Sequence, residues 1–245
     1  MLTDLPLRSD REPVVGSGMG GDETTAIDAA AERAILARFE GLDGLTIVSE
    51  EVGVIGAGET FVVIDPIDGS LNAKRGIGFF ALSIAVASGP TMADVDFGFV
   101  HDFGTGEEWT ATRGEGARLD GTPLADELPK EQIEILAFEA TRTVSVAEQA
   151  AAVVELAYRL RIMGSLALSL CHLAAGRIDA VCSLKPARAV DIAAAQLLVL
   201  ERGLAIDLPD APPFAAAPLD VEGRSRVVAA GTPEVCRRLA HALSA

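Results

Sequence analysis

The chain has 245 residues, of which 49% are hydrophobic, so it can bury a sizeable core in one domain or in two closely packed halves. Its formal net charge of −16 excludes proteins that bind nucleic-acid backbones, because they need a cationic surface to neutralise phosphates. Apolar runs are too short to span a membrane, and the amino terminus lacks a signal-peptide core, so we expect a cytoplasmic protein with no membrane partner.

The first predicted elements are a helix and two buried strands. The helix covers Thr24–Phe39, where apolar residues recur at helical spacing between a possible cap, Asp22, and a possible stop, Gly41. Two short apolar runs without alternation follow, at Leu45–Ser49 and Phe61–Asp65. Such runs are typical of strands covered on both faces, as in a parallel sheet.

Strand and helix patterns alternate along the rest of the chain. The further predicted strands are Phe80–Ala87, Val95–His101, Glu107–Thr112, Ile133–Phe138, Ile178–Ser183 and Arg226–Ala230. The further predicted helices are Val146–Tyr158, Leu166–Ala175, Ile192–Arg202 and Pro233–Leu243. This order predicts an α/β chain, with the polar stretch Asp120–Glu131 as the seam between an amino-terminal α+β half (residues 1–125) and a carboxyl-terminal α/β half (residues 126–245).

The segment from Asp65 to Ser70 carries the first candidate site, because it joins a strand end to a helix start. Asp65 and Asp68 can point into one space, and the Ile67 carbonyl adds a third hard oxygen ligand of the kind that Mg²⁺ prefers. The backbone N–H groups of Gly69 and Ser70 are expected to face a phosphate. An ordinary turn explains this fragment equally well, since Asp, Pro and Gly also favour turns.

The position of Glu50, directly after the strand Leu45–Ser49, favours a metal site over an ordinary turn. If this strand lies parallel to Phe61–Asp65, Glu50 and Asp65 meet at the carboxyl edge of one sheet. Several carboxylates gathered there repel one another and are costly to bury, so the cluster implies a bound divalent cation.

Two further acids have simpler explanations when each is considered alone. Asp191 directly precedes the helix Ile192–Arg202, and an N-cap is the better interpretation. Asp28 lies three residues after Thr25 inside the first helix, where a solvated face is the better interpretation.

In combination these motifs resemble those of the inositol monophosphatase superfamily, most closely the archaeal enzymes that act on both inositol monophosphate and fructose 1,6-bisphosphate. The resemblance covers nearly the whole chain and is carried by Gly21–Asp28, Val48–Glu51, Asp65–Asn72, Gly114–Gly121, Gly164–Ser165, Gly176–Ala180 and Asp191–Ala195. It implies a layered sugar-phosphatase fold of alternating helix and sheet layers, a metal site between the two halves, and a homodimer.

The resemblance also implies the metal ligands. Two to three Mg²⁺ ions are expected, one held by Glu50, Asp65 and the Ile67 carbonyl, and a second held by Asp65, Asp68 and Asp191. A third, more weakly bound ion is expected to use Glu50 as a ligand. These ions would activate a water molecule for in-line attack on the phosphate.

The roles in catalysis are implied in the same way. Thr25 or Ser70, oriented by Asp28, is expected to position the attacking water, and Glu50 to accept its proton. The residues expected to bind the substrate are Asp68, Gly69, Ser70, Gly164, Ser165, Lys185 and Arg188.

The resemblance implies that the substrate is a small phosphorylated sugar or polyol, and its identity rests on few residues. Animal enzymes of the superfamily use a glutamate to grip inositol hydroxyls, which would fall near Leu184 or Lys185, where no acid exists. Lys185 and Arg188 instead suit a second phosphate, and an equally good explanation is that they only neutralise nearby acids. We therefore expect Mg²⁺-dependent hydrolysis of fructose 1,6-bisphosphate, as in gluconeogenesis, of inositol 1-phosphate, or of both.

Two alternatives stay open. A 3′(2′),5′-bisphosphate nucleotidase of the same superfamily would need an adenine pocket, which this chain with 4% aromatic residues hardly offers. A catalytically silent relative kept for protein interaction is the other alternative.

His172 is expected to be a core histidine, and Cys171, Cys182 and Cys236 are expected to be buried thiols, since no C-x-x-C spacing is present.

Overall fold

The larger of two main sheets is built from the first half of the chain. The computed structural model describes residues 4–19, 21, 23–124, 132–139, 142–210 and 213–244. In spatial order the strands of this sheet are β10 (Thr122–Pro123), β9 (Gly116–Leu119), β8 (Glu108–Thr112), β7 (Val95–Asp102), β6 (Ala81–Ala87), β5 (Thr60–Asp68), β3 (Leu45–Ser49) and β4 (Gly53–Gly56). Strands β3 and β5 are parallel neighbours, as expected for two apolar runs without alternation, and their neighbours pair antiparallel.

The smaller sheet comes from the second half of the chain. Its strands, in spatial order, are β12 (Ala157–Arg161), β11 (Ile133–Glu139), β13 (Ala180–Ser183), β15 (Val228–Ala230) and β14 (Ala205–Asp207). The first three are parallel to one another, and β15 runs antiparallel to both of its neighbours. Near the amino terminus, β1 (Val14–Ser17) and β2 (Glu23–Thr25) form a separate antiparallel pair.

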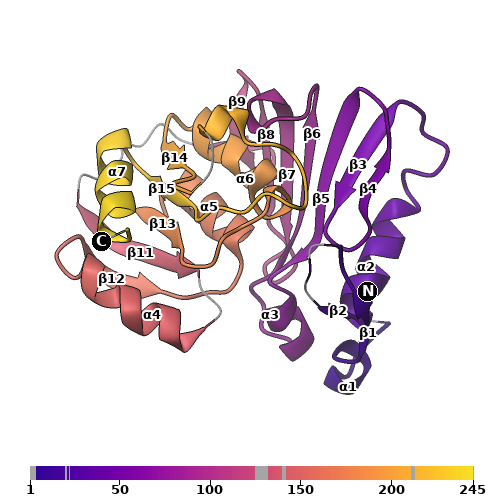
Figure 1. Ribbon diagram of the computed structural model, residues 1–245, viewed down its shortest axis with the longest axis horizontal. Helices are drawn as coiled ribbons and strands as arrows, with labels where there is room; N and C mark the ends of the chain where they lie inside the picture. Colours follow the sequence, from indigo (N-terminus) through magenta and orange to yellow (C-terminus); the bar gives the residue numbers. More distant parts are fainter. Residues whose placement is uncertain are drawn as a thin grey trace.

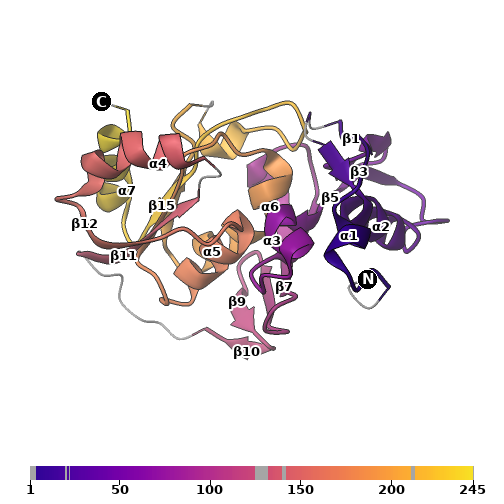
Figure 2. The same ribbon diagram turned by 90° about the horizontal axis from the view of Figure 1, so that it is seen from below.

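Helices separate and cover the two sheets. The α-helices are α1 (Arg8–Arg11), α2 (Ala26–Leu36), α3 (Ser70–Arg75), α4 (Thr143–Ala150), α5 (Leu166–Ala174), α6 (Ala189–Glu201) and α7 (Pro233–Ala242). Helices α5 and α6 lie between the sheets, α2 covers the outer face of the larger sheet, and α7 covers the outer face of the smaller one (Figures 1 and 2). The predicted α/β architecture of alternating helix and sheet layers is confirmed.

Helix α6 is the centre of the core. Every residue from Ile192 to Val199 is buried, as expected for an apolar helix that is pressed on more than one side. Its small residues let β7 approach closely, and a Cβ added to Gly98 would lie 2.5 Å from the backbone oxygen of Ala194. This contact fixes α6, and the acid Asp191 in its first turn, against the larger sheet.

The predicted helix Val146–Tyr158 is wrong in its second half. Helix α4 ends at Ala150, a 3-10 turn follows at Ala151–Val153, and the chain then forms β12. Strand β12 pairs with the edge of β11 from Ile133↔Ala157 onward. The backbone hydrogen bonds available at that edge outweigh the local helical preference.

Two predicted boundaries fall outside the described residues. Asp22, the predicted cap of the first helix, is one of them, and the structure instead starts α2 after Thr25. The predicted division between residues 125 and 126 is the other.

Among the described helices, none combines the length and the apolar character needed to cross a bilayer. The cysteines Cys171, Cys182 and Cys236 are buried free thiols, as predicted.

Candidate functional site

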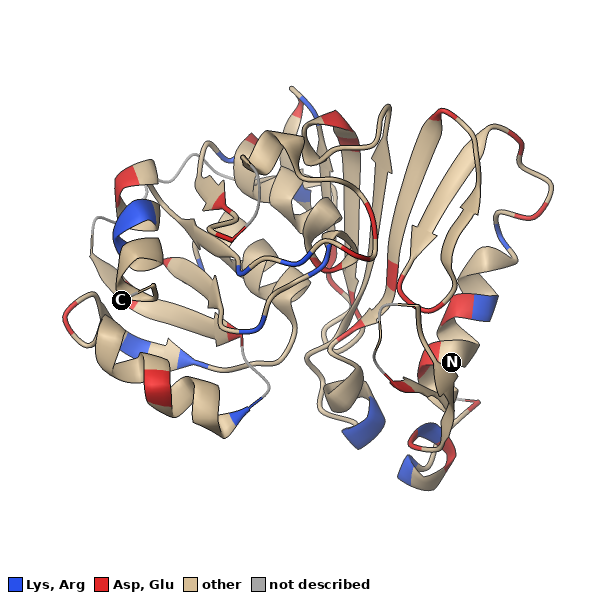
Figure 3. Cartoon of the chain, viewed as in Figure 1, with Lys and Arg blue, Asp and Glu red and all other residues tan. Residues whose placement is uncertain are grey.

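Two predicted metal ligands meet at the carboxyl edge of the parallel pair. In the β3–β5 register Ser49 lies opposite Ile64, so Glu50 and Asp65 follow at the same edge. Asp65 is only 1% exposed. Figure 3 shows acidic segments at these strand ends meeting basic loop segments between the two sheets. The expectation that the strand order brings Glu50 beside Asp65 is confirmed.

The segment after Asp65 is an irregular strand and not a simple turn. Strand β5 continues to Asp68, with a bulge between Asp65 and Asp68 where Pro66 cannot donate to the sheet. The Ile67 N–H donates to Asp65 Oδ1 at 3.0 Å. Ser70 Oγ donates to the Ile67 carbonyl at 3.0 Å, and a carbonyl keeps a second lone pair for another partner. The bulge turns two carboxylates and one carbonyl toward one region.

Asp68 is held by the start of α5. Its Oδ2 accepts hydrogen bonds from Ser165 Oγ at 2.6 Å and from the Ala167 N–H at 2.6 Å. Ser165 is also the N-cap of α5, since its Oγ accepts from the Leu168 N–H at 3.2 Å. Ser165 is 1% exposed, so in this structure its hydroxyl serves Asp68 and the helix.

Asp191 lies inside the first turn of α6. The helix begins at Ala189, three residues earlier than predicted, so the simple N-cap interpretation is wrong. Asp191 Oδ2 accepts the backbone N–H of Arg188 at 2.7 Å, the reciprocal half of a capping arrangement. This bond turns the carboxylate back toward the start of the helix and toward Glu50.

Arg188 connects acids from both halves of the chain. Its Nη2 donates to Glu50 Oε1 and, at 3.2 Å, to Asp191 Oδ1. Its Nε donates to the same Asp191 oxygen at 3.3 Å. The side chain is buried, so the pairing is little screened by solvent.

Thr25 and Asp28 form a second buried pair at the start of α2. Asp28 Oδ2 accepts from the Thr25 N–H at 3.1 Å and from its hydroxyl. Both residues are buried, so the solvated-face interpretation of Asp28 is wrong. Strand β2 leads directly into α2, and the helix therefore starts against the protein interior.

Burial sets the charge state of the acids. It raises the pKa of Glu50 to about 7, with the ion pair to Arg188 opposing the rise. It raises the pKa of Asp68 to about 8 against the hydrogen bond from Ser165. Burial and the neighbouring acids raise the pKa of Asp65 well above its usual range. The cluster holds more acids than the single guanidinium of Arg188 can neutralise, so the donor set fits a divalent cation that prefers oxygen.

A cavity of about 560 Å³ opens onto these acids. Its lining includes nearly all of the predicted site residues: Asp28, Glu50, Asp65, Ile67, Asp68, Gly69, Ser70, Gly164, Lys185, Arg188 and Asp191. Thr25 and Ser165 stand behind this lining, each bonded to a lining carboxylate. Sequence reasoning gave no role to several charged residues of the wall, among them Lys74, Glu139 and Arg224.

Glu139 is the most deeply placed of these three missed residues. It ends β11, and its carboxylate accepts from the Gly164 N–H at 2.8 Å and from Ser169 Oγ at 2.6 Å. Burial raises its pKa to about 7. The available signal was an acid directly after a buried strand, the same signal that identified Glu50. Glu139 and Asp68 thus both hold the start of α5 through hydrogen bonds.

Replacing Glu139 by glutamine should flatten the pH dependence of stability. The pKa of Glu139 in the folded protein, about 7, lies above the ordinary value of 4.5. The protonated carboxyl therefore stabilises the fold fully below pH 4.5, and this stabilisation is lost as the pH rises through 7. A shift of this size corresponds to roughly 3 kcal/mol of unfolding free energy. Urea unfolding of the metal-free proteins at pH 5 and pH 8 should show a smaller loss in Glu139→Gln than in the wild type, and equal losses would contradict this assignment.

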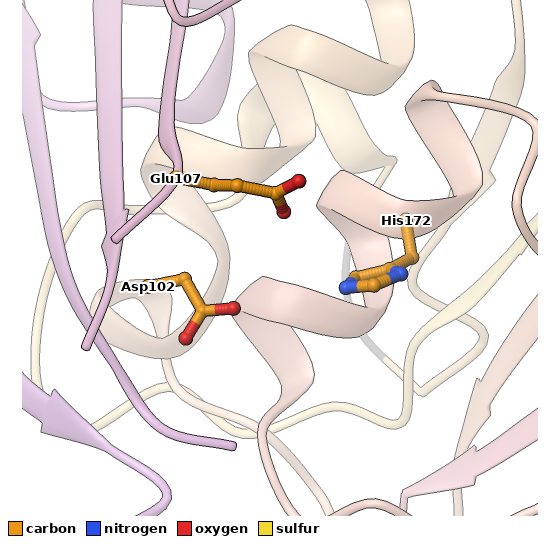
Figure 4. Close-up of side chains that lie close together, drawn as sticks. All are labelled: Asp102, Glu107 and His172. Atoms are coloured by element: carbon orange, nitrogen blue, oxygen red, sulfur yellow. The ribbon is translucent and has the colours of Figure 1, made fainter. Parts of the chain in front are cut away.

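A second group of ligand-type side chains lies elsewhere in the fold. Among the described residues, Asp102, Glu107 and His172 each place a ligand atom within 4.8 Å of the others (Figure 4). Both Glu107 oxygens already accept from Arg177, at 2.6 and 2.8 Å. Asp102 accepts from the Thr105 hydroxyl at 2.9 Å. The guanidinium of Arg177 balances the negative charge of these carboxylates. The group therefore links the β7–β8 connection to the carboxyl end of α5.

This chain is similar, in sequence and in structure, to several known proteins. The profile described as the inositol monophosphatase family matches residues 8–244. The fructose-1,6-bisphosphatase/inositol-1-monophosphatase of Methanothermobacter thermautotrophicus is 31% identical over 248 residues, covering 96% of this chain and 88% of that protein. The Nus factor SuhB of Pasteurella multocida is 33% identical, covering 74% of this chain and 70% of that protein. The crystal structure of an inositol monophosphatase-fructose 1,6 bisphosphatase superimposes with a TM-score of 0.83 at 30% identity, covering 96% and 90% of the two chains.

Proposed function

Because the chain belongs to the inositol monophosphatase family and is a phosphatase, we propose that it uses Mg²⁺ to hydrolyse fructose 1,6-bisphosphate, inositol 1-phosphate, or both. The observation that carries this proposal is the convergence of Glu50, Asp65, Asp68 and Asp191 on one cavity, which no short segment of chain could achieve. Oxygen ligands of this kind suit Mg²⁺ better than softer metals.

The residues that would hold two to three Mg²⁺ ions are the four acids and the Ile67 carbonyl. Bound there, the ions would supply Lewis-acid stabilisation of the phosphoryl charge and would lower the pKa of a water molecule. Asp65 would be shared between ions, because its carboxylate lies at the strand end between Glu50 and the bulge that leads to Asp68.

The chain's own groups would orient the attacking water. The Thr25 hydroxyl is fixed by its bond to Asp28, so its lone pairs are presented in one direction. Glu50 is placed to take the proton, because its carboxylate lines the cavity. Ser70, the other candidate hydroxyl, lines the cavity and is fixed in the same way, because it donates its proton to the Ile67 carbonyl.

The substrate phosphate would lie against the Gly69–Ser70 backbone. Gly69 has φ 95°, and an added Cβ would meet the Gly164 oxygen at 3.0 Å, so only glycine fits here. Lys185 and Arg224 line the same cavity, and their positive charges suit a second phosphate. None of the described residues that line it is aromatic, which supports a sugar or polyol over an adenine nucleotide.

Lys185 should discriminate between the two substrates. We expect Lys185→Ala to raise KM for fructose 1,6-bisphosphate by about tenfold or more, because a charge-assisted contact to a phosphate is worth roughly 1.5–3 kcal/mol. KM for inositol 1-phosphate, which has no second phosphate, should change far less. Steady-state kinetics on both substrates check this expectation, and equal changes in KM would remove Lys185 from the second-phosphate site.

The direct test of the proposed function is phosphate release from fructose 1,6-bisphosphate and inositol 1-phosphate, measured side by side with Mg²⁺ and with a chelator. Adenosine 3′,5′-bisphosphate serves as the third substrate. Metal-dependent release from either sugar or polyol phosphate supports the proposal. Release from the nucleotide alone would replace it with the nucleotidase.

A role in protein interaction, in addition to phosphate release, is the second candidate, since one relative carries the name Nus factor SuhB. Metal binding by the acids can be tested separately from turnover. Mg²⁺ should raise Tm if the acids bind it, because a ligand that binds only the folded state stabilises that state. An unchanged Tm together with no phosphate release from these substrates would contradict the proposed metal site and leave the interaction role.

A further inference from the structure

Arg188 lies among the acids that are proposed to bind metal. Its guanidinium contacts Glu50 from the larger sheet and Asp191 from α6, and its charge also acts on Asp65. The single atom Nη2 is shared between Glu50 and Asp191, which come from opposite halves of the chain. The guanidinium therefore joins two of the four acids directly and acts electrostatically on a third.

A guanidinium and a divalent cation would compete for the same carboxylate oxygens. Asp191 Oδ1 already receives two N–H groups of Arg188, and Glu50 Oε1 receives a third donor contact. A cation bound to these oxygens would meet a fixed positive charge within contact distance, and that repulsion is strong in a buried site. The acids are not drawn together as tightly as Asp102, Glu107 and His172, the described group whose ligand atoms all lie within 4.8 Å.

We propose that Arg188 is the built-in counter-ion of the metal-free site, and that metal binding displaces its guanidinium from Glu50 and Asp191 into the cavity. This inference rests on the proposed metal-dependent function. It assigns Arg188 as a positioning residue that sets metal affinity, in addition to any contact with substrate.

The surrounding backbone allows the guanidinium to move alone. The Arg188 N–H stays bonded to Asp191 Oδ2, and the preceding residue is fixed by the Ala187–Ser225 bridge, with hydrogen bonds of 2.6 and 3.1 Å. The side chain can therefore rotate while the start of α6 stays in place. It moves into a cavity that it already lines, where its charge meets a bound phosphate.

Metal affinity is the first test. Calorimetric titration with Mg²⁺ at about pH 8.5, where protons compete least for the acids, should show about tenfold or more tighter binding by Arg188→Gln than by the wild type, since an opposing buried charge is removed. The matched control is Arg113→Gln, which breaks the remote ion pair with Asp96 and should leave the affinity unchanged. Equal or weaker binding by Arg188→Gln would overturn the proposal.

The wild-type protein offers a second test that does not depend on the variant being stable. The Nε–H resonance of Arg188, in protein labelled with ¹⁵N-arginine and assigned by its loss in Arg188→Gln or by its contacts to Asp191, should shift and exchange faster with water when Mg²⁺ saturates the site. A resonance that stays unchanged at saturation contradicts displacement.

The two proposals fail differently. If the wild type binds no Mg²⁺, the metal-dependent function and the displacement both fall. If the wild type binds Mg²⁺ and releases phosphate, but Arg188 neither shifts nor limits affinity, only the displacement falls.

Discussion

Replacing Asp65 by asparagine should lower kcat for phosphate release by about 10³-fold or more, because losing a shared metal ligand removes several kcal/mol of transition-state stabilisation. The protein should stay folded. The new side-chain amide would keep an oxygen for the Ile67 N–H, which now donates to Asp65 Oδ1. Burial and neighbouring acids raise the pKa of Asp65, so the ionised form is costly without metal, and the variant should be at least as stable as the wild type at about pH 8.

The measurement combines phosphate release, Mg²⁺ titration and urea unfolding on the same preparations. Asp96→Asn is the matched control, because Asp96 pairs with Arg113 away from the cavity and its loss should leave turnover unchanged. Retained turnover in Asp65→Asn would contradict the assigned metal site. Lost turnover with lost folding would instead assign Asp65 a structural role.

Replacing Gly98 by alanine should destabilise the protein by about 3 kcal/mol, the upper range for overpacking a close-packed core. The added Cβ would lie 2.5 Å from the Ala194 oxygen, and the backbone of a buried helix cannot move aside as a flexible side chain can. Since α6 also carries Asp191, the helix shift should lower the affinity for Mg²⁺ as well. Urea unfolding and metal titration measure the two effects.

Gly16→Ala is the control for this substitution. Its added Cβ would have Thr24 Cβ as its nearest neighbour, at 3.9 Å, which is ordinary van der Waals contact. We expect its unfolding free energy to stay within about 0.5 kcal/mol of the wild type, as for most substitutions away from close contacts. Equal stability of Gly98→Ala and Gly16→Ala would show that α6 can relax away from β7.

Local patterns predicted the half of the site that is built by neighbouring strands. Glu50, Asp65 and Asp68 are near the ends of short apolar runs, and the parallel pairing of those runs follows from their lack of alternation. The α/β class and most element positions were predicted for the same reason, since periodicity reports which faces are buried. The second half of the helix Val146–Tyr158 was mispredicted, because an edge of β11 was available to pair with it.

The resemblance to a known family supplied what local patterns could not. Considered alone, Asp191 was interpreted as a cap and Asp28 as a surface residue, because their use depends on what packs against the start of each helix. The structure buries Asp28 against Thr25 and turns Asp191 toward Glu50. Neither outcome is encoded within one turn of helix.

Only the tertiary structure decided which charges meet. The ion pair of Arg188 with Glu50, the bond from Ser165 to Asp68, and the burial of Glu139 behind Gly164 all join segments that are distant in the sequence. By itself the sequence determined that Glu50, Asp65 and Asp68 lie near strand ends, since these positions follow from local periodicity and turn chemistry. The packing of α5 and α6 between two sheets determined which partners these acids meet, because a buried charge takes the partner that the fold places beside it.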